Sequence, residues 1–168
     1  MATTEPRGGI APVLVFACGN PSRGDDALGP AFVDRVAARF ADAVGAGELE
    51  LLTDFQLQAE HALDLVGRDQ IVFVDASVSC AAPFAWVPVQ PSREVGYTTH
   101  VMSPAAVLAT YVLVEGSDPP PAHVLAIRGE RFELGEGLSV AAQAHLDAAI
   151  RHFGDWFAVS GPRPRRDR

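Results

Sequence analysis

The chain has 168 residues, of which 48% are hydrophobic and 20% charged, as expected for a folded globular protein with one core. Its formal net charge of −8 creates an acidic field that repels phosphate backbones and anionic lipids, so we expect neither nucleic-acid nor membrane binding. All 13 basic residues are arginine. The lack of lysine excludes enzymes that need a lysine amine, such as pyridoxal-phosphate enzymes and Walker A NTPases.

Cysteine usage and the N-terminal residues indicate the compartment. Cys18 and Cys80 form neither a CxxC pair nor a disulfide framework, which favours a reducing environment. The first residues, MATTEPRGG, contain no apolar signal core, and no apolar run approaches the roughly 20 residues of a membrane span. We therefore expect a cytoplasmic protein.

The first half of the chain alternates apolar strands with helical segments. Residues 10–18 (IAPVLVFAC) are an almost continuous apolar run, which predicts a strand buried on both faces. The turn-forming GNPSRGDD follows, and residues 27–42 carry large apolar side chains at three- and four-residue intervals, which predicts a helix. The next expected elements are a short strand over 48–53, a helix over 57–66 with Leu57, Ala62, Leu63 and Leu65 in the core, and a strand over 70–76.

The second half continues the alternation. Prolines limit residues 83–89 to an edge strand or hairpin arm. Ser103 followed by Pro104 predicts a helix start, residues 122–128 predict a strand, and Ser139 is expected to cap a last helix that reaches about residue 159. The pattern predicts an α/β fold, a three-layer αβα sandwich with a twisted, mainly parallel sheet and helices on both faces. We expect one domain over 10–159, with flexible tails at 1–9 and 160–168.

Two carboxylates and a histidine are candidates for one site. Asp26 lies in the loop after the first strand and Asp75 at the end of the third, so one edge of a parallel sheet can bring them within a few ångströms. Their repulsion would require a cation or a shared proton. His100 could join them in a nitrogen and oxygen site that suits Ni²⁺, Zn²⁺ or Co²⁺. The alternative is structural: Asp25 or Asp26 caps a helix, Asp75 accepts N–H groups of the next loop, and His100 is a surface residue.

Other chemistries have weaker signals. Cys18 ends an apolar strand, so we interpret it as packing rather than as a nucleophile. The sequence contains no G-x-S-x-G elbow and no H-E-x-x-H helix. GNPSRG lacks the second glycine of the dinucleotide fingerprint, so a flavodoxin-like small-molecule or nucleotide-binding protein stays only an alternative.

Three strings resemble a known family: VFACGNPSRGDDALGP, the strand end FVDAS, and YTTHVMSP before a helix. They are similar to the hydrogenase maturation endopeptidases, the nickel-dependent processing proteases of nickel–iron hydrogenases. DFQLQAEHALDL and HVLAIRGERFELGEGLS resemble the branch that serves bidirectional, NAD-linked hydrogenases. The resemblance covers about residues 12 to 150, and it implies the same twisted sheet with helices on both faces.

The resemblance also implies an activity and a set of residues. Such enzymes, aspartic-type by family classification, remove a C-terminal extension from the hydrogenase large-subunit precursor after nickel insertion. The alternative is an assembly chaperone that binds the subunit without cutting it. The implied catalytic residues are Asp26 and Asp75, the implied metal ligands are Asp26, Asp75 and His100, and the implied substrate-binding residues are Gly19, Asn20, Asp54 and Gln56.

Nickel is expected to arrive with the substrate, and Zn²⁺ or Cd²⁺ to substitute for it in vitro. The expected partner is the large-subunit precursor, and the expected state is a monomer. One residue departs from the family pattern, because well-studied members carry glutamate where this chain has Asp26. The missing methylene shortens the reach by roughly 1.5 Å, so a closer backbone or a bridging water is needed.

Overall fold

The computed structural model describes residues 9–93 and 102–162; His100 and most of the predicted tails lie outside them. A five-stranded sheet forms the middle of the molecule, in the order β2-β1-β3-β5-β4. The strands are β1 (Val13–Cys18), β2 (Leu49–Asp54), β3 (Gln70–Ser77), β4 (Phe84–Val89) and β5 (Ala122–Arg128). All neighbours are parallel except β4, which pairs antiparallel with β5 at one edge. The predicted mainly parallel sheet and proline-bearing edge strand are confirmed.

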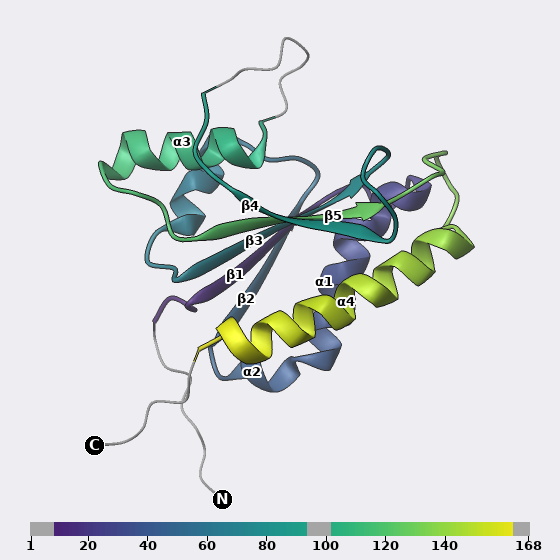
Figure 1. The fold of residues 1–168 in the computed structure, drawn as a ribbon, viewed down its shortest axis with the longest axis horizontal. Helices are drawn as coiled ribbons and strands as arrows, with labels where there is room; N and C mark the ends of the chain where they lie inside the picture. Colours follow the sequence, from purple (N-terminus) through teal and green to yellow (C-terminus); the bar gives the residue numbers. More distant parts are fainter. Residues whose placement is uncertain (1–8, 94–101, 163–168) are drawn as a thin grey trace, which may run out of the picture.

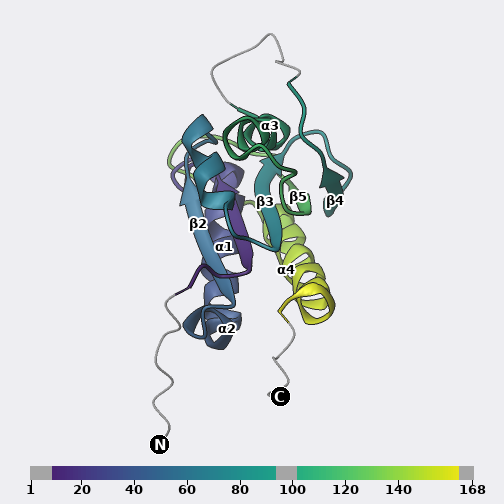
Figure 2. The ribbon, with the colours of Figure 1, turned by 90° about the vertical axis from the view of Figure 1, so that its left-hand side faces the viewer.

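Helices cover both faces of the sheet, as predicted. Figure 1 shows α3 (Pro104–Glu115) above the sheet, and α1 (Leu28–Arg39), α2 (Ala41–Gly45) and α4 (Val140–Ser160) below it. The 3₁₀ helix η2 (Ala59–Leu65) packs beside α3, and the 3₁₀ helix η1 (Gly24–Ala27) joins β1 to α1. Figure 2, turned by 90°, shows β2 and β4 at opposite edges of the sheet. The result is a three-layer αβα sandwich.

Each face of the sheet has its own core, because successive strand residues point to opposite faces. In β1, Val13, Val15 and Ala17 pack towards α1 and α4. Leu14, Phe16 and Cys18 pack towards η2 and α3. All six residues of β1 are buried, which confirms the predicted strand from Val13 onwards. Its predicted first residues, 10–12, precede β1, and Ile10 is 58% exposed. The side chain of Cys18, the last residue of β1, points to the α3 face.

Both serine caps predicted from the sequence are present. The Ser103 hydroxyl accepts a hydrogen bond from the Ala106 N–H at 3.1 Å, with Pro104 in the first turn of α3. The Ser139 hydroxyl accepts one from the Ala142 N–H at 3.1 Å at the start of α4. These contacts fix where α3 and α4 begin. Both helices begin near the end of the sheet where the carboxyl ends of the parallel strands meet.

The segment expected to be a helix over 57–66 is the shorter 3₁₀ helix η2. With three residues per turn, Ala62 and Leu65 share the inward face and are 2% and 0% exposed. Leu63 lies about a third of a turn away and is 62% exposed, so its predicted place in the core is wrong.

In the described part of the chain, no helix combines the length and the apolar character needed to cross a bilayer.

Candidate active site

The strand order places a crevice beyond the end of β1. The chain leaves β1 through α1 to β2 on one side, and β3 then pairs with β1 on the other side. In open parallel sheets, ligands bind outside the carboxyl ends of the strands where the order reverses in this way. The loops after β1, β2 and β3 therefore meet at one rim, and these loops carry most of the residues singled out from the sequence.

Strand register aligns two carboxylates with Cys18. Cys18 in β1 is the register partner of Asp54 in β2. Ala17 pairs with Val74 in β3, so Asp75 stands one step further along, beside Cys18. Partners in register point to the same face, so Asp54, Cys18 and Asp75 form a row on the α3 face of the sheet.

Asp26 approaches the same row from the loop after β1. Its Oδ2 accepts a hydrogen bond from the Asn20 N–H at 3.0 Å, and the Gly19 N–H donates to the Asp54 carbonyl oxygen at 3.2 Å. Gly19 has φ +147°, and a Cβ built there would lie 2.0 Å from the Asp26 carbonyl oxygen. A side chain at Gly19 would push Asp26 away, so glycine is required for this tight turn. Gly19 and Asn20 thus shape the loop that carries Asp26.

The two neighbouring acids in this loop have different surroundings. Asp25 is 0% exposed and accepts four hydrogen bonds, from the N–H groups of Glu130 (2.8 Å), Arg131 (3.0 Å) and Ser139 (2.7 Å) and from the Ser139 hydroxyl (2.8 Å). Burial alone would raise the pKa of Asp25, but these donors together lower it below its usual value. Asp25 therefore has a structural role, but it anchors residues 130, 131 and 139 instead of capping the adjacent helices, since neither η1 nor α1 has a side-chain cap. Asp26 is only half-buried.

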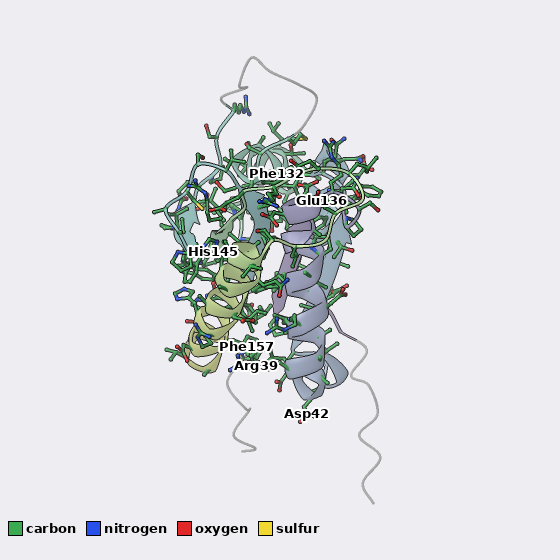
Figure 3. All side chains as sticks on the ribbon, turned by 90° about the vertical axis from the view of Figure 1, so that its right-hand side faces the viewer. Arg39, Asp42, Phe132, Glu136, His145 and Phe157 are labelled. Carbon is green, nitrogen blue, oxygen red and sulfur yellow. The ribbon has the colours of Figure 1, made fainter. Side chains whose placement is uncertain are left out.

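Asp25 ties the loop after β1 to the segment that precedes α4. The Asp25 N–H donates to the Arg131 carbonyl at 2.6 Å, and the Gly24 N–H donates to the Glu136 carbonyl at 3.1 Å. Figure 3 shows this segment, marked by Phe132 and Glu136, at the upper end of α1, with α4 running beside that helix. The contact holds η1 in place and so determines where Asp26 lies.

The carboxylates at the rim influence the titration of their neighbours. Burial first, and then the charges of Asp75, Asp54 and Asp26, raise the pKa of the Cys18 thiol to about 12. Cys18 is therefore a neutral thiol at pH 7, which supports its interpretation as packing. Asp75 is open to solvent on one side. Burial of its other side, together with the charge of Asp26, raises its pKa to about 6, and the hydrogen bond from the Ala76 N–H opposes this shift. A carboxylate with this pKa can accept a proton near neutral pH.

His61 was not identified from the sequence, although it contacts one of the predicted residues. Its Nδ1 accepts a hydrogen bond from the Gln58 N–H at 2.9 Å, which leaves the proton on Nε2, 3.2 Å from Asp54 Oδ2. The ring lies 4.5 Å from the ring of Phe16. Gln58 and His61 have the spacing of a capping box. This spacing is the sequence signal that could have revealed the hydrogen bond between the Gln58 N–H and His61. His61 holds both ends of the segment from Asp54 to Gln58.

A cavity of about 300 Å³ opens beside Asp75 on the α3 face. Its walls come from β1, β3, β5, the segment after β2 and the first residues of α3. They include Phe16, Cys18, Gln56, Leu57, Phe73, Asp75, Met102 and Val124. A hollow of about 560 Å³ beside the first turn of α4 is larger but more open, and none of the three rim carboxylates lines it. The smaller cavity is the one associated with the candidate site.

Asp26 and Asp75 supply two oxygen donors that suit a divalent cation. Within residues 9–93 and 102–162, no group of three or more His, Cys, Asp or Glu side chains is arranged to hold a metal ion. His100, the third expected ligand, lies outside the described residues. The predicted ligand set of Asp26, Asp75 and His100 therefore stays a prediction; Asp26 and Asp75 lie near enough for the charge of Asp26 to act on Asp75.

Solved structures with this architecture include several hydrogenase maturation proteases. The hydrogenase maturating endopeptidase HybD from E. coli is 22% identical, with a TM-score of 0.66, over 93% of this chain and 99% of that one. The hydrogenase maturation protease HycI from Thermococcus kodakarensis is 18% identical, with a TM-score of 0.61, over 88% and 93%. A hydrogenase 2 maturation peptidase from a Thaumarchaeota archaeon is 18% identical, with a TM-score of 0.60, over 88% and 97%.

The comparisons of sequence alone give no match. No family model matches the chain, and no curated protein matches it either. The likeness in structure extends over nearly the whole length of both chains in each pair. The chain has the fold of the hydrogenase maturation endopeptidases.

Proposed function

We propose that this protein is an endopeptidase of hydrogenase maturation, which removes the C-terminal extension of a nickel–iron hydrogenase large-subunit precursor once nickel has been inserted. The observation that carries the proposal is the set of carboxylates, Asp26, Asp54 and Asp75, around the end of β1 in a fold shared with proteases of this kind. The sequence resemblance favours a bidirectional, NAD-linked hydrogenase in the cytoplasm as the client.

Nickel acts in this proposal as part of the substrate. Nickel held by cysteine thiolates of the precursor would present open coordination positions to Asp26, Asp75 and His100. These ligands add binding energy only when the metal is present, so precursor without nickel binds weakly. Contact with the metal also fixes the scissile peptide bond beside the site, which converts a distant bond into a positioned neighbour.

Hydrolysis of the peptide bond needs a group that accepts a proton from water. A carboxylate that is not bound to nickel, Asp26 or Asp75, suits this role, and in the metal-free protein the pKa of Asp75, raised to about 6, lies close to neutral pH. Asp26 lies near enough for its charge to contribute to that shift. The Asn20 N–H that holds Asp26 and the Ala76 N–H that holds Asp75 keep the two carboxylates directed to the rim.

The test is incubation with purified precursor, either nickel-loaded or nickel-free, followed by intact-mass analysis. We expect loss of the C-terminal peptide from the loaded precursor only. Asp75→Asn and His100→Ala should stop cleavage, whereas Asp118→Asn should not, because Asp118 is exposed in the loop before β5, at the opposite end of the sheet. A folded His100→Ala variant that cleaves at the normal rate would refute the ligand assignment.

Precursor binding and thermal stabilisation separate the proposal from its alternatives. Stable binding of the precursor without a change of mass would indicate an assembly chaperone. Thermal stabilisation by nucleotides, and not by nickel or cadmium, would indicate a small-molecule-binding protein instead.

A further inference from the structure

The cavity beside Asp75 has an apolar interior and a polar rim. Phe16, Phe73 and Leu57, which are 2%, 3% and 6% exposed, line it from the core of the α3 face, and Val124 closes it from β5. Cys18, which is 7% exposed, contributes its buried side chain to the wall. Among the described residues that line the cavity, none carries a positive charge. A charged group buried against Phe16, Phe73 and Leu57 would lose its hydration, and Asp75 could partner only a cation that stays near the opening, so the bottom of the cavity favours an uncharged, apolar group.

The size of the cavity limits what it can hold. At about 300 Å³ it lies at the lower end of the range for ligand pockets, which is roughly 300 to 1,000 Å³. That volume suits one amino-acid side chain and is small for a dinucleotide. The charge of Asp75, which lines the cavity, also repels phosphates and acidic side chains.

The position of the cavity relates it to the bond that is cut. Asp75 lines the cavity and is also one of the two carboxylates proposed to act in the cleavage. A substrate peptide bound for cleavage at Asp75 would therefore lie next to the opening of the cavity. The segment 55–57, which forms one wall, is held at both ends by His61 through Asp54 and Gln58. The wall is thus fixed before any substrate arrives, which lowers the entropic cost of binding.

We propose that this cavity is a specificity site, which receives one apolar side chain of the protein substrate at or next to the cleaved peptide bond. The inference rests on the proposed function and specifies the substrate further. Burial of a valine-, leucine- or methionine-sized side chain is worth about a 10- to 100-fold preference over a residue that leaves the cavity empty.

The experiment uses a panel of nickel-loaded precursors in which each of the two residues on either side of the cut is leucine, alanine or aspartate. We expect one position at which leucine is cleaved about 10- to 100-fold faster than alanine or aspartate. Val124→Phe, which fills the cavity, should remove this preference by slowing the leucine substrate more than the alanine substrate, so that the ratio of the two rates approaches one. Val114→Phe is the matched control, because Val114 is 58% exposed near the far end of α3, about 15 Å along the helix from its first residues.

Each result has a distinct meaning. Equal rates for all residues at all four positions, or an unchanged preference in folded Val124→Phe, would overturn the specificity site while the protease activity stands. Absence of cleavage of every precursor by the unmodified protein would overturn the proposed function itself. If circular dichroism shows that Val124→Phe is unfolded, Met102→Trp narrows the mouth of the same cavity from a half-buried position and takes its place.

Discussion

Replacement of Asp25 by alanine should destabilise the protein far more than replacement of its neighbour Asp26. Asp25→Ala removes a fully buried carboxylate and leaves three N–H groups and one hydroxyl without their acceptor. Hydrogen bonds to a charged group contribute about 1.5–3 kcal/mol each but are not additive, and loss of one partner of a buried charged network costs about 3–5 kcal/mol. We expect a loss of about 4 kcal/mol, which corresponds to a fall in Tm of roughly 8–16 °C for a domain of this size.

The assay is urea unfolding followed by circular dichroism. Asp26→Ala is the matched control: it removes one hydrogen bond, from the Asn20 N–H, at a half-buried site and should cost about 1 kcal/mol or less. Asp25→Asn keeps the shape but directs an NH₂ group at donors, so it should resemble Asp25→Ala. A loss below about 1 kcal/mol for Asp25→Ala, or an equal loss for both alanine variants, would refute the reasoning.

Acid provides a second check on Asp25. Because its pKa in the folded protein lies below the unfolded value, the unfolded state binds more protons, and this carboxylate stabilises the fold above its unfolded pKa. That contribution is lost as the pH falls through the folded pKa. The difference in stability between the unmodified protein and Asp25→Asn should therefore shrink as the pH falls below about 4. A constant difference between pH 7 and pH 3 would contradict the assignment.

Three further predictions concern the rim and its support. Gly29→Ala should lower the free energy of unfolding in urea by about 1–3 kcal/mol, because its Cβ would lie 2.1 Å from the Cys18 carbonyl oxygen. The control Gly45→Ala, with nothing within 4 Å of its Cβ, should be neutral or slightly stabilising. Equal effects of the two substitutions would contradict the close approach at Gly29. Asp75→Asn should raise Tm at pH 7 but not at pH 4, since the pKa of Asp75 is raised to about 6 and its charged form opposes folding above that pH; a lower Tm at pH 7 would refute this. Cys18 should resist alkylation at pH 8 in the folded protein, because burial raises its pKa to about 12, so intact mass should show at most one label, on the half-buried Cys80, and two labels in urea; rapid addition of two labels to the folded protein would show that Cys18 is accessible.

Local sequence patterns were sufficient for most of the sheet and for two helix starts. The strand predicted over 122–128 coincides with β5, and the strand over 48–53 differs from β2 by one residue at each end. Ser103 and Ser139 were predicted as caps because a hydroxyl three residues before a backbone N–H is a local relation. The helix predicted over 57–66 is the 3₁₀ helix η2, and its period of three residues per turn leaves Leu63 outside the core.

The sequence by itself determined the layers of this protein and the sheet edge at which Asp26 and Asp75 end, because alternating apolar runs and helical periods are properties of neighbouring residues. Only the tertiary structure decided which of two adjacent acids is buried and which faces the rim, and that His61 holds Asp54. Asp25 is anchored by residues 105 to 114 positions away, and no short pattern encodes a partner at that separation. The positions of such donors depend on how α4 packs against α1 and β5, which is decided by the whole core.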